Sequence, residues 1–202
     1  MKLQDKVAVI TGGGSGLGRQ GAQLFASEGA KVAVVDIDGD RAEQTAKLVE
    51  QQGGTAIAIT ADVSDEAAVY RSVEATVDQF GKLDIMWANA GVVSRGGVPS
   101  VAGGEHVEFQ DLTDADWQHV LGVNLSGVVY SCKAAVPAMR ANGGGTILAT
   151  SSAASFAITA SRCTRRRKPA STAWFAASAW ISDGTGFAST PSLPPTGCRR
   201  TS

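Results

Sequence analysis

Three glycines near the N-terminus are spaced to hold a negatively charged diphosphate. The stretch "VAVITGGGSGLGRQGAQLFA" starts as a β-branched run, turns through glycine and continues as a helical pattern, with Gly12, Gly16 and Gly18 in GxxxGxG spacing. Glycine permits a tight turn and close approach of the backbone to a ligand, and the amides that open the following helix favour an anion. A glycine cluster alone also fits a flexible turn. The strand before it and the helix after it favour the diphosphate site.

A carboxylate ends the next β-branched run, "KVAVVD" (31–36). Asp36 is placed where an acid can accept hydrogen bonds from both ribose hydroxyls of an adenosine. It would repel a 2′-phosphate, and no Arg or Lys follows it in "DIDGD", so the pattern predicts NAD rather than NADP. The alternative is a solvated acid at a strand end, or a helix cap shared with Asp38 and Asp40.

Further short motifs follow in a fixed order. They are "TGGGSGLG" (11–18), "ADV" (61–63), "ANAG" (88–91), "VNLSG" (123–127) and "GTILATSS" (145–152). Their ordered combination resembles the classical short-chain dehydrogenase/reductase family, over about the first 155 residues. The resemblance implies NAD-dependent hydride transfer between a secondary alcohol and a ketone, in a homodimer or homotetramer.

The resemblance also implies roles for particular residues. Asp62 and Val63 would contact the adenine end, and Asn89 with its neighbours would form the cofactor floor. Asn124 and Ser152 would belong to a catalytic Asn, Ser, Tyr, Lys set. Taken alone, Asp62 and Asn89 also fit turn residues, Asn124 a hydrogen bonder within a helix, and Ser152 a cap. The full set of implied cofactor-binding residues is Gly12, Ser15, Gly16, Leu17, Gly18, Asp36, Asp62, Val63, Asn89 and Gly91.

The chemistry of that family needs a tyrosine and a lysine that are absent here. The tyrosine exchanges the hydroxyl proton, a lysine four residues later lowers the tyrosine pKa, and the serine binds the substrate oxygen. The YxxxK pattern is expected about twelve residues after Ser152, but the two tyrosines, Tyr70 and Tyr130, lie upstream. We therefore expect weak or no dehydrogenase activity from the chain as written.

A second reading frame of the same codons can encode the missing pair. If the last base of each codon joins the first two of the next, and the synonymous bases are chosen freely, "CTRRRKPAS" can read "YSASKAGV", with the tyrosine arising at Cys163. Our hypothesis is that the frame slipped between Ser152 and Cys163, through an error in reading the gene or a mutation. The C-terminal strands would then be missing or scrambled, which leaves "GTILAT" at an open sheet edge and predicts poor folding.

The elements that must position these residues alternate along the chain. β-branched runs and stretches with apolar residues three and four apart are typical of βαβ units around a buried parallel sheet. We predict an α/β, Rossmann-type doubly wound sheet for 1–155, followed by an aberrant basic tail at 156–202. A glycine-rich loop at 92–113 follows the fourth strand, where substrates usually bind. The predicted strands are 6–10, 31–36, 55–60, 83–88 and 145–150, and the predicted helices lie near 17–28, 40–52, 65–80 and 114–140.

The formal net charge of −1 conceals two oppositely charged parts. Residues 161–202 hold seven Lys or Arg and one acid, hence +6, which leaves −7 for the first 160 residues. A basic tail of this kind can bind nucleic acid, but nothing in the first 160 residues supports that role, and we expect no nucleic-acid partner. Nucleic-acid binding and NAD binding without catalysis remain the alternative functions.

Cysteine usage and hydropathy exclude other classes. Cys132, Cys163 and Cys198 have neither metal-ligand spacing nor an even disulfide framework, so reduced thiols and no metal site are expected. No stretch of the ~20 apolar residues that span a bilayer is evident, and the N-terminus is unlike a signal peptide. These patterns predict a cytoplasmic protein without a membrane partner, acting on a small alcohol or ketone that the sequence does not identify.

Overall fold

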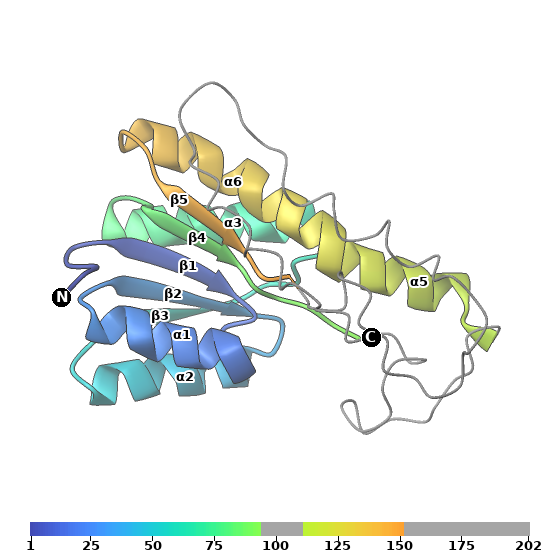
Figure 1. Ribbon diagram of the computed structural model, residues 1–202, viewed down its shortest axis with the longest axis horizontal. Coiled ribbons are helices and arrows are strands. Elements are labelled where there is room, and N and C mark those ends of the chain that lie inside the picture. Colours follow the sequence, from blue (N-terminus) through green and yellow to red (C-terminus); the bar gives the residue numbers. More distant parts are fainter. Residues whose placement is uncertain (94–110, 152–202) are drawn as a thin grey trace, which may run out of the picture.

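Five parallel strands form the centre of the computed structural model, which describes residues 1–93 and 111–151 (Figure 1). Their order in the sheet is β3-β2-β1-β4-β5. The chain therefore builds outward from β1 to β3 on one side and then crosses to β4 on the other. In such doubly wound sheets, ligands bind at the carboxyl ends of the strands where the order reverses, here between β1 and β4. The strands are β1 (Val7–Thr11), β2 (Lys31–Asp36), β3 (Thr55–Thr60), β4 (Ile85–Ala88) and β5 (Thr146–Ala149).

Helices cover both faces of this sheet (Figure 1). One face is covered by α1 (Gly16–Ser27) and α2 (Gly39–Gln51). The other is covered by α3 (Glu66–Phe80) and α6 (Gly127–Ala141). A further helix, α5 (Asp114–Leu121), runs through the π-helical turn η2 (Gly122–Ser126) into α6 and projects beyond the end of the sheet.

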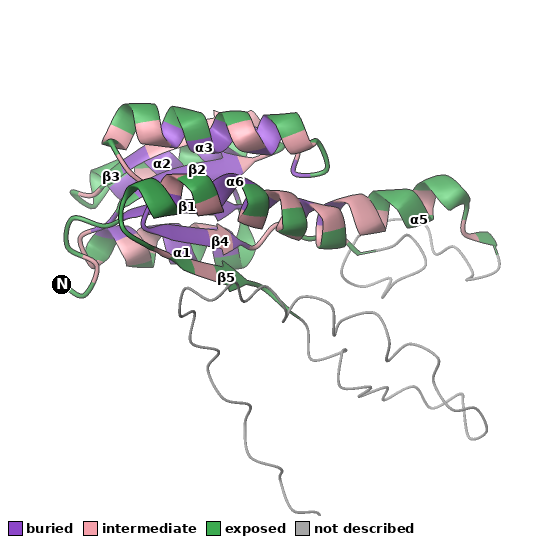
Figure 2. Cartoon of the chain, turned by 90° about the horizontal axis from the view of Figure 1, so that it is seen from above, coloured by how far each residue is buried: buried purple, intermediate pink, exposed green. Residues whose placement is uncertain are grey.

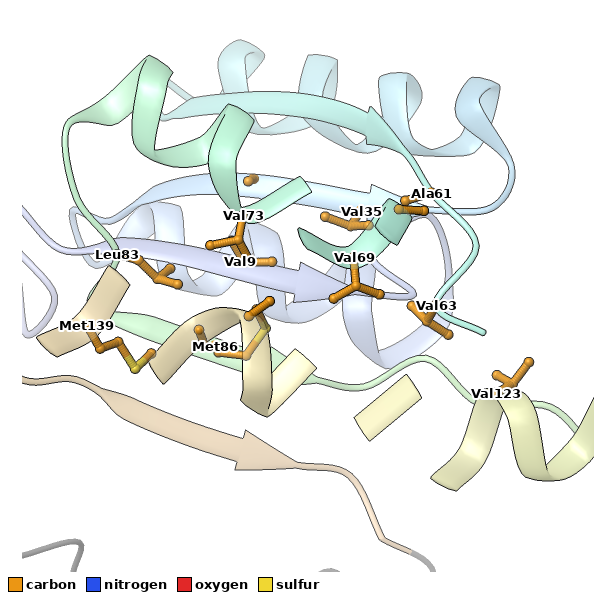
Figure 3. Packing of buried hydrophobic residues seen from close by; sticks show 14 residues of the cluster. Val9, Val35, Ala61, Val63, Val69, Val73, Leu83, Met86, Val123 and Met139 are labelled. Carbon is orange, nitrogen blue, oxygen red and sulfur yellow. The ribbon is translucent and has the colours of Figure 1, made fainter. Parts of the chain in front are cut away.

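The strand residues separate into two apolar cores because successive side chains point to opposite faces. Ile10 and Val34 face α1 and α2. Val9, Val35 and Met86 face α3 and α6, where they pack around Val69 and Met139 of the helices (Figure 3). Every residue of β1 is buried, as expected of a strand covered on both faces.

The predicted strands and helices are present, each displaced by no more than two residues at its ends. The predicted helix at 114–140 differs, because it consists of α5, η2 and α6. At the edge, β5 pairs only with β4 within the described residues, and Ile147 alone among its residues is partly covered (Figure 2). Ser152, the proposed frame slip and the division at residue 155 lie outside the described residues and stay predictions.

The continuous helix Asp114–Ala141 corrects the expectation that no stretch could span a bilayer. Its 28 residues, with a mean hydropathy of 1.2 in its most apolar window, are long and apolar enough by length and composition. It is one such helix in the described part of the chain. Ala134, Ala135 and Met139 of its α6 part belong to the core, so this part packs against protein.

Candidate dinucleotide site at the carboxyl edge of the sheet

The turn between β1 and α1 has a backbone that requires glycine. Gly12 has φ +64°, and a Cβ there would lie 2.8 Å from the Cα of Ala90. A Cβ on Gly18 would lie 2.1 Å from the carbonyl oxygen of Gly12. Gly16, with φ +48°, has no atom within 4 Å of its Cβ position. Gly12 and Gly18 are therefore packed tightly against the protein, whereas the backbone at Gly16 is open. This arrangement suits close approach of a ligand to the backbone.

The N-terminus of α1 has neither a side-chain cap nor an acidic residue in its first turn. Asp38 and Asp65 cap α2 and α3 with side-chain hydrogen bonds, whereas Ser15 begins α1 in extended backbone without one. The first turn of α1 holds no acidic residue. Leu17 in this turn is 69% exposed. Amides at the positive end of a helix favour an anion, and the binding of a diphosphate here stays a prediction.

Asp36 lies beside the glycine turn and is held there by backbone amides. The N–H of Gly14 donates to its Oδ2 at 2.8 Å, and the N–H of Asp38 donates to its Oδ1 at 3.1 Å. Asp38, and not Asp36, caps α2, because its Oδ1 accepts from the N–H of Arg41 at 3.1 Å. The carboxylate of Asp36 thus accepts from amides beside the glycine turn and does not cap α2 itself, and its contact with a ribose stays a prediction.

Asn89 joins the ends of β1 and β4. Its side-chain amide donates to the carbonyls of Thr11 at 3.0 Å and Gly12 at 3.4 Å. The Thr11 hydroxyl accepts from the backbone N–H groups of Asn89 at 2.9 Å and Ala90 at 3.1 Å. These bonds cross the point where the strand order reverses, so Asn89 supports the glycine turn from below.

Asn124 holds the segment that follows Asn89. Its Oδ1 accepts from the N–H of Val92, and its Nδ2 donates to the Val92 carbonyl, both at 2.8 Å. A Cβ on Gly91 would lie 3.4 Å from the Asn124 Oδ1. Asn124 lies in η2, and extra residues in single π-turns are frequent at functional sites. The two-point contact with Val92 gives a physical reason for the π-turn that the sequence pattern did not predict.

Asp62 and Val63 are engaged within the protein. The Oδ1 of Asp62 accepts from the N–H of Ser64 at 2.8 Å and from its hydroxyl at 2.7 Å, as in an Asx-turn. Val63 is 7% exposed and contacts the place of a Cβ on Gly127 at 2.9 Å. Contact of these two residues with an adenine stays a prediction.

Several residues of the site were missed by sequence reasoning. Arg19 of α1 donates through Nε to the buried Thr45 hydroxyl at 3.0 Å and through a second nitrogen to the Gly14 carbonyl. Thr150, at the end of β5, bonds to Asn89. Thr11 precedes the glycines directly and Thr150 lies in "GTILATSS", but only their contacts in space reveal these roles.

Tyr70, Tyr130 and Cys132 lie on the helices that cover one face of the sheet. Tyr70 on α3 and Tyr130 on α6 pack against the larger core. Burial raises the pKa of the Cys132 thiol on α6, which favours the uncharged form. Within 1–93 and 111–151, no group of three His, Cys, Asp or Glu side chains is arranged to hold a metal.

A doubly wound sheet with a glycine turn after β1 and an acid after β2 defines the class of Rossmann-type dinucleotide-binding domains. The family model described as short chain dehydrogenase matches residues 6–164. The chain belongs to the short-chain dehydrogenase/reductase family of oxidoreductases. Membership indicates a nicotinamide cofactor, either NAD(H) or NADP(H).

Relatives and solved structures agree with this assignment. An uncharacterized oxidoreductase from Thermotoga maritima is 37% identical, with 81% of this chain and 60% of the relative aligned. Cyclohexanol dehydrogenase from an Acinetobacter species is 37% identical, over 76% of this chain and 57% of the relative. The structure of a 7α-hydroxysteroid dehydrogenase with NADH and 7-oxo glycochenodeoxycholic acid has a TM-score of 0.67 at 32% identity, covering 77% and 56%. The chain thus spans about 60% or less of the length of these proteins.

Proposed function

We propose that this protein binds NAD(H) and descends from an enzyme that interconverts a secondary alcohol and a ketone. The observation that carries the proposal is the carboxylate of Asp36, which two backbone amides hold beside an open glycine turn. A carboxylate in this place accepts the two hydroxyls of an adenosine ribose. Gly12, Gly16 and Gly18 would hold the diphosphate, and Asn89 would support the turn.

The charges around Asp36 favour NAD over NADP. A carboxylate repels the 2′-phosphate that distinguishes NADP. Arg41 follows Asp36 by five residues, and its Cβ lies 2.8 Å from the place of a Cβ on Gly14. Its guanidinium forms an exposed ion pair with Asp38 at 3.0 Å. The NADH bound to the related hydroxysteroid dehydrogenase also supports this choice.

The substrate class is inferred from the relatives. Cyclohexanol is a secondary alcohol, and the 7-oxo group of the bile acid is a ketone. When bound, the nicotinamide exchanges a hydride with the carbon that carries the oxygen. Asn124 would fix the floor segment at Val92, and Ser152 would bind the substrate oxygen. A homodimer or homotetramer and a cytoplasmic location stay predictions, as does most of the substrate loop at 92–113.

A second candidate is NAD binding without catalysis. It is favoured by the absence of any tyrosine after Tyr130, so that the chain as written has no YxxxK pair to move the proton. This candidate keeps the whole described site, since Asp36, Asn89 and the glycine turn do not depend on the missing pair.

Calorimetric titration with NAD⁺ and NADP⁺, together with turnover on a panel of secondary alcohols, tests the proposal. We expect NAD⁺ to bind more tightly than NADP⁺. Asp36→Ala removes hydrogen bonds to a charged group and should weaken NAD⁺ binding by at least about tenfold. Asp40→Ala is the matched control, since it removes an exposed acid from the first turn of α2 and should leave the affinity unchanged.

The outcomes separate the candidates. Binding without turnover favours the non-catalytic function, and binding with turnover favours the enzyme. No affinity of the native chain for NAD⁺, or an equal loss in both variants, would refute the assignment of Asp36.

A further inference from the structure

The indole ring of Trp87 in β4 packs against α1, the helix that begins after the glycine turn. Its ring fills the space that a side chain at position 21 would need, since a Cβ on Gly21 would lie 2.0 Å from the indole Cζ3. Phe25, one turn further along α1, stacks on the same ring with centroids 5.7 Å apart and planes at 22°. The position of the indole is therefore fixed relative to α1.

The indole N–H of Trp87 begins a chain of hydrogen bonds. It donates to the Thr150 hydroxyl at 3.0 Å, and that hydroxyl donates to the Oδ1 of Asn89 at 3.0 Å. On its other side, the Asn89 amide donates to the carbonyls of Thr11 and Gly12. Three strands, β4, β5 and β1, are thus connected at their carboxyl ends.

The direction of this chain follows from the chemistry of its first member. An indole nitrogen can only donate, so it occupies an acceptor position of the Thr150 hydroxyl. The single hydroxyl proton is then directed at Asn89, whose oxygen must face it. The Asn89 NH₂ group is thereby left to face the Thr11 and Gly12 carbonyls, which could not accept from an oxygen.

We propose that Trp87 and Thr150 are positioning residues for the cofactor: their hydrogen bonds orient the Asn89 amide, which in turn holds the glycine turn in the shape that binds the diphosphate. This inference rests on the proposed binding of NAD. Neither residue needs to touch the cofactor, because each acts through Asn89 and the carbonyl of Gly12. Gly18, whose Cβ position meets that same carbonyl, carries the effect into α1.

Variants of Thr150 separate the hydroxyl from the shape of the side chain. Thr150→Val keeps the size and removes both hydrogen bonds, and should raise the Kd for NAD⁺ about tenfold, the effect of a lost oriented bond. Thr150→Ser restores the hydroxyl and should bind like the native chain. Thr146→Val, the same change at the opposite end of β5, is the matched control and should not change the Kd.

Trp87→Phe provides an independent route to the same result. It keeps an aromatic ring next to Gly21 and Phe25 but removes the donor, so the Kd should rise as it does in Thr150→Val. A second readout needs no cofactor: the NMR resonance of the Trp87 indole N–H in the free protein should move in Thr150→Val and stay in place in Thr146→Val.

Three results would overturn the inference. The first is an unchanged Kd in both Thr150→Val and Trp87→Phe. The second is a Kd for Thr150→Ser as high as that of Thr150→Val. The third is an indole resonance that does not shift in Thr150→Val. Failure of the native chain to bind NAD⁺ would instead refute the proposed function, and the inference with it. Thermal midpoints of all variants ensure that each titration is made on folded protein.

Discussion

Asp84 is a buried carboxylate at the amino edge of the sheet, opposite the cofactor site. It is 6% exposed. Its oxygens accept from the N–H of Val7 at 2.9 Å and from the ammonium groups of Lys82 at 2.9 Å and Lys6 at 3.1 Å. Asn142, after α6, donates to it at 3.3 Å. One side chain therefore connects β1, β4 and the end of α6.

We expect Asp84→Asn to destabilise the fold by about 2–3 kcal/mol near neutral pH, because an amide has one oxygen in place of two and would turn its N–H either toward the buried N–H of Val7 or toward the lysine ammonium groups. Burial by itself raises the pKa of Asp84, but hydrogen bonds from Lys82, Val7 and Lys6 outweigh it and hold the pKa below the ordinary value of 3.8. Since the folded pKa lies below the unfolded one, the ionised carboxylate stabilises the fold above the unfolded pKa. That contribution is lost as the pH falls through the folded pKa.

Thermal unfolding at several pH values checks this prediction. The difference between the native chain and Asp84→Asn should be largest near neutrality and should shrink below a pH of about 4. Asp78→Asn, on the exposed side of α3, is the control and should cost little at any pH. A difference of constant size across the acid range would show that charge is not the source of the stabilisation.

The two aspartates show what can be predicted at the scale of a residue. The position of Asp36 beside the glycine turn was predictable, because an acid at the end of a β-branched run that follows a glycine turn is a local pattern. Asp84 was not, because its partners at Val7 and Asn142 are 77 and 58 residues away along the chain. A pattern reports neighbours in sequence, whereas burial of a charge depends on neighbours in space.

The contact between α1 and β4 gives a prediction at the scale of elements. Alanine in place of Gly21, inside α1, should gain about 1 kcal/mol of helix propensity. Its Cβ would, however, lie 2.0 Å from the Trp87 ring, on which Phe25 of the same helix also stacks. We expect Gly21→Ala to destabilise the native chain by about 1–3 kcal/mol, as for an overpacked core.

A double-mutant cycle tests whether the clash is the cause. In a Trp87→Val background the ring is gone, and Gly21→Ala should then be neutral or stabilising. Urea unfolding of the four chains measures the coupling. Equal effects of Gly21→Ala in both backgrounds would show that the contact between α1 and β4 does not limit the size of this residue.

Element boundaries were largely predictable, because hydrophobic periodicity and strand composition are local. The exception is instructive. Apolar spacing across 114–140 predicted one regular helix, but Asn124 bonds at two points to the backbone of Val92, and the helix takes a π-turn there. The bonding partner of Asn124 lies 32 residues earlier in the chain, which the periodicity of the helix itself does not record.

At the scale of the whole molecule, the parallel doubly wound sheet follows from the alternation of strands and helices, since βαβ crossovers place helices on both faces. The observed order β3-β2-β1-β4-β5 is that of a doubly wound sheet, in which the strand order reverses beside β1. The exposure of β5 is a property of the assembled sheet: Leu148, in the middle of this strand, is 42% exposed, whereas β1 is buried throughout (Figure 2). Within the described residues, no further strand pairs with β5 at this edge.

The reading-frame hypothesis would explain the exposed edge at β5, and it predicts that the corrected gene encodes the missing tyrosine and lysine. The family match ends at residue 164, next to Cys163, where the second frame can encode tyrosine. Resequencing of the gene across codons 150–170 should reveal a one-frame displacement and, in the corrected frame, a YxxxK pair. An unbroken frame without a tyrosine codon in this interval would exclude the hypothesis.

Expression of the chain as written and of the corrected chain tests the hypothesis by their cofactor binding and turnover. The chain as written, identified by its mass of 20.7 kDa, should bind NAD⁺ through the described site. Its turnover should be lower than that of the corrected chain by at least about a hundredfold, the usual contribution of one positioned proton-transfer group. The corrected chain should also unfold at a higher temperature, because continued strands would cover β5. Turnover by the 20.7 kDa form equal to that of the corrected chain would show that the protein moves the proton without the tyrosine and lysine pair.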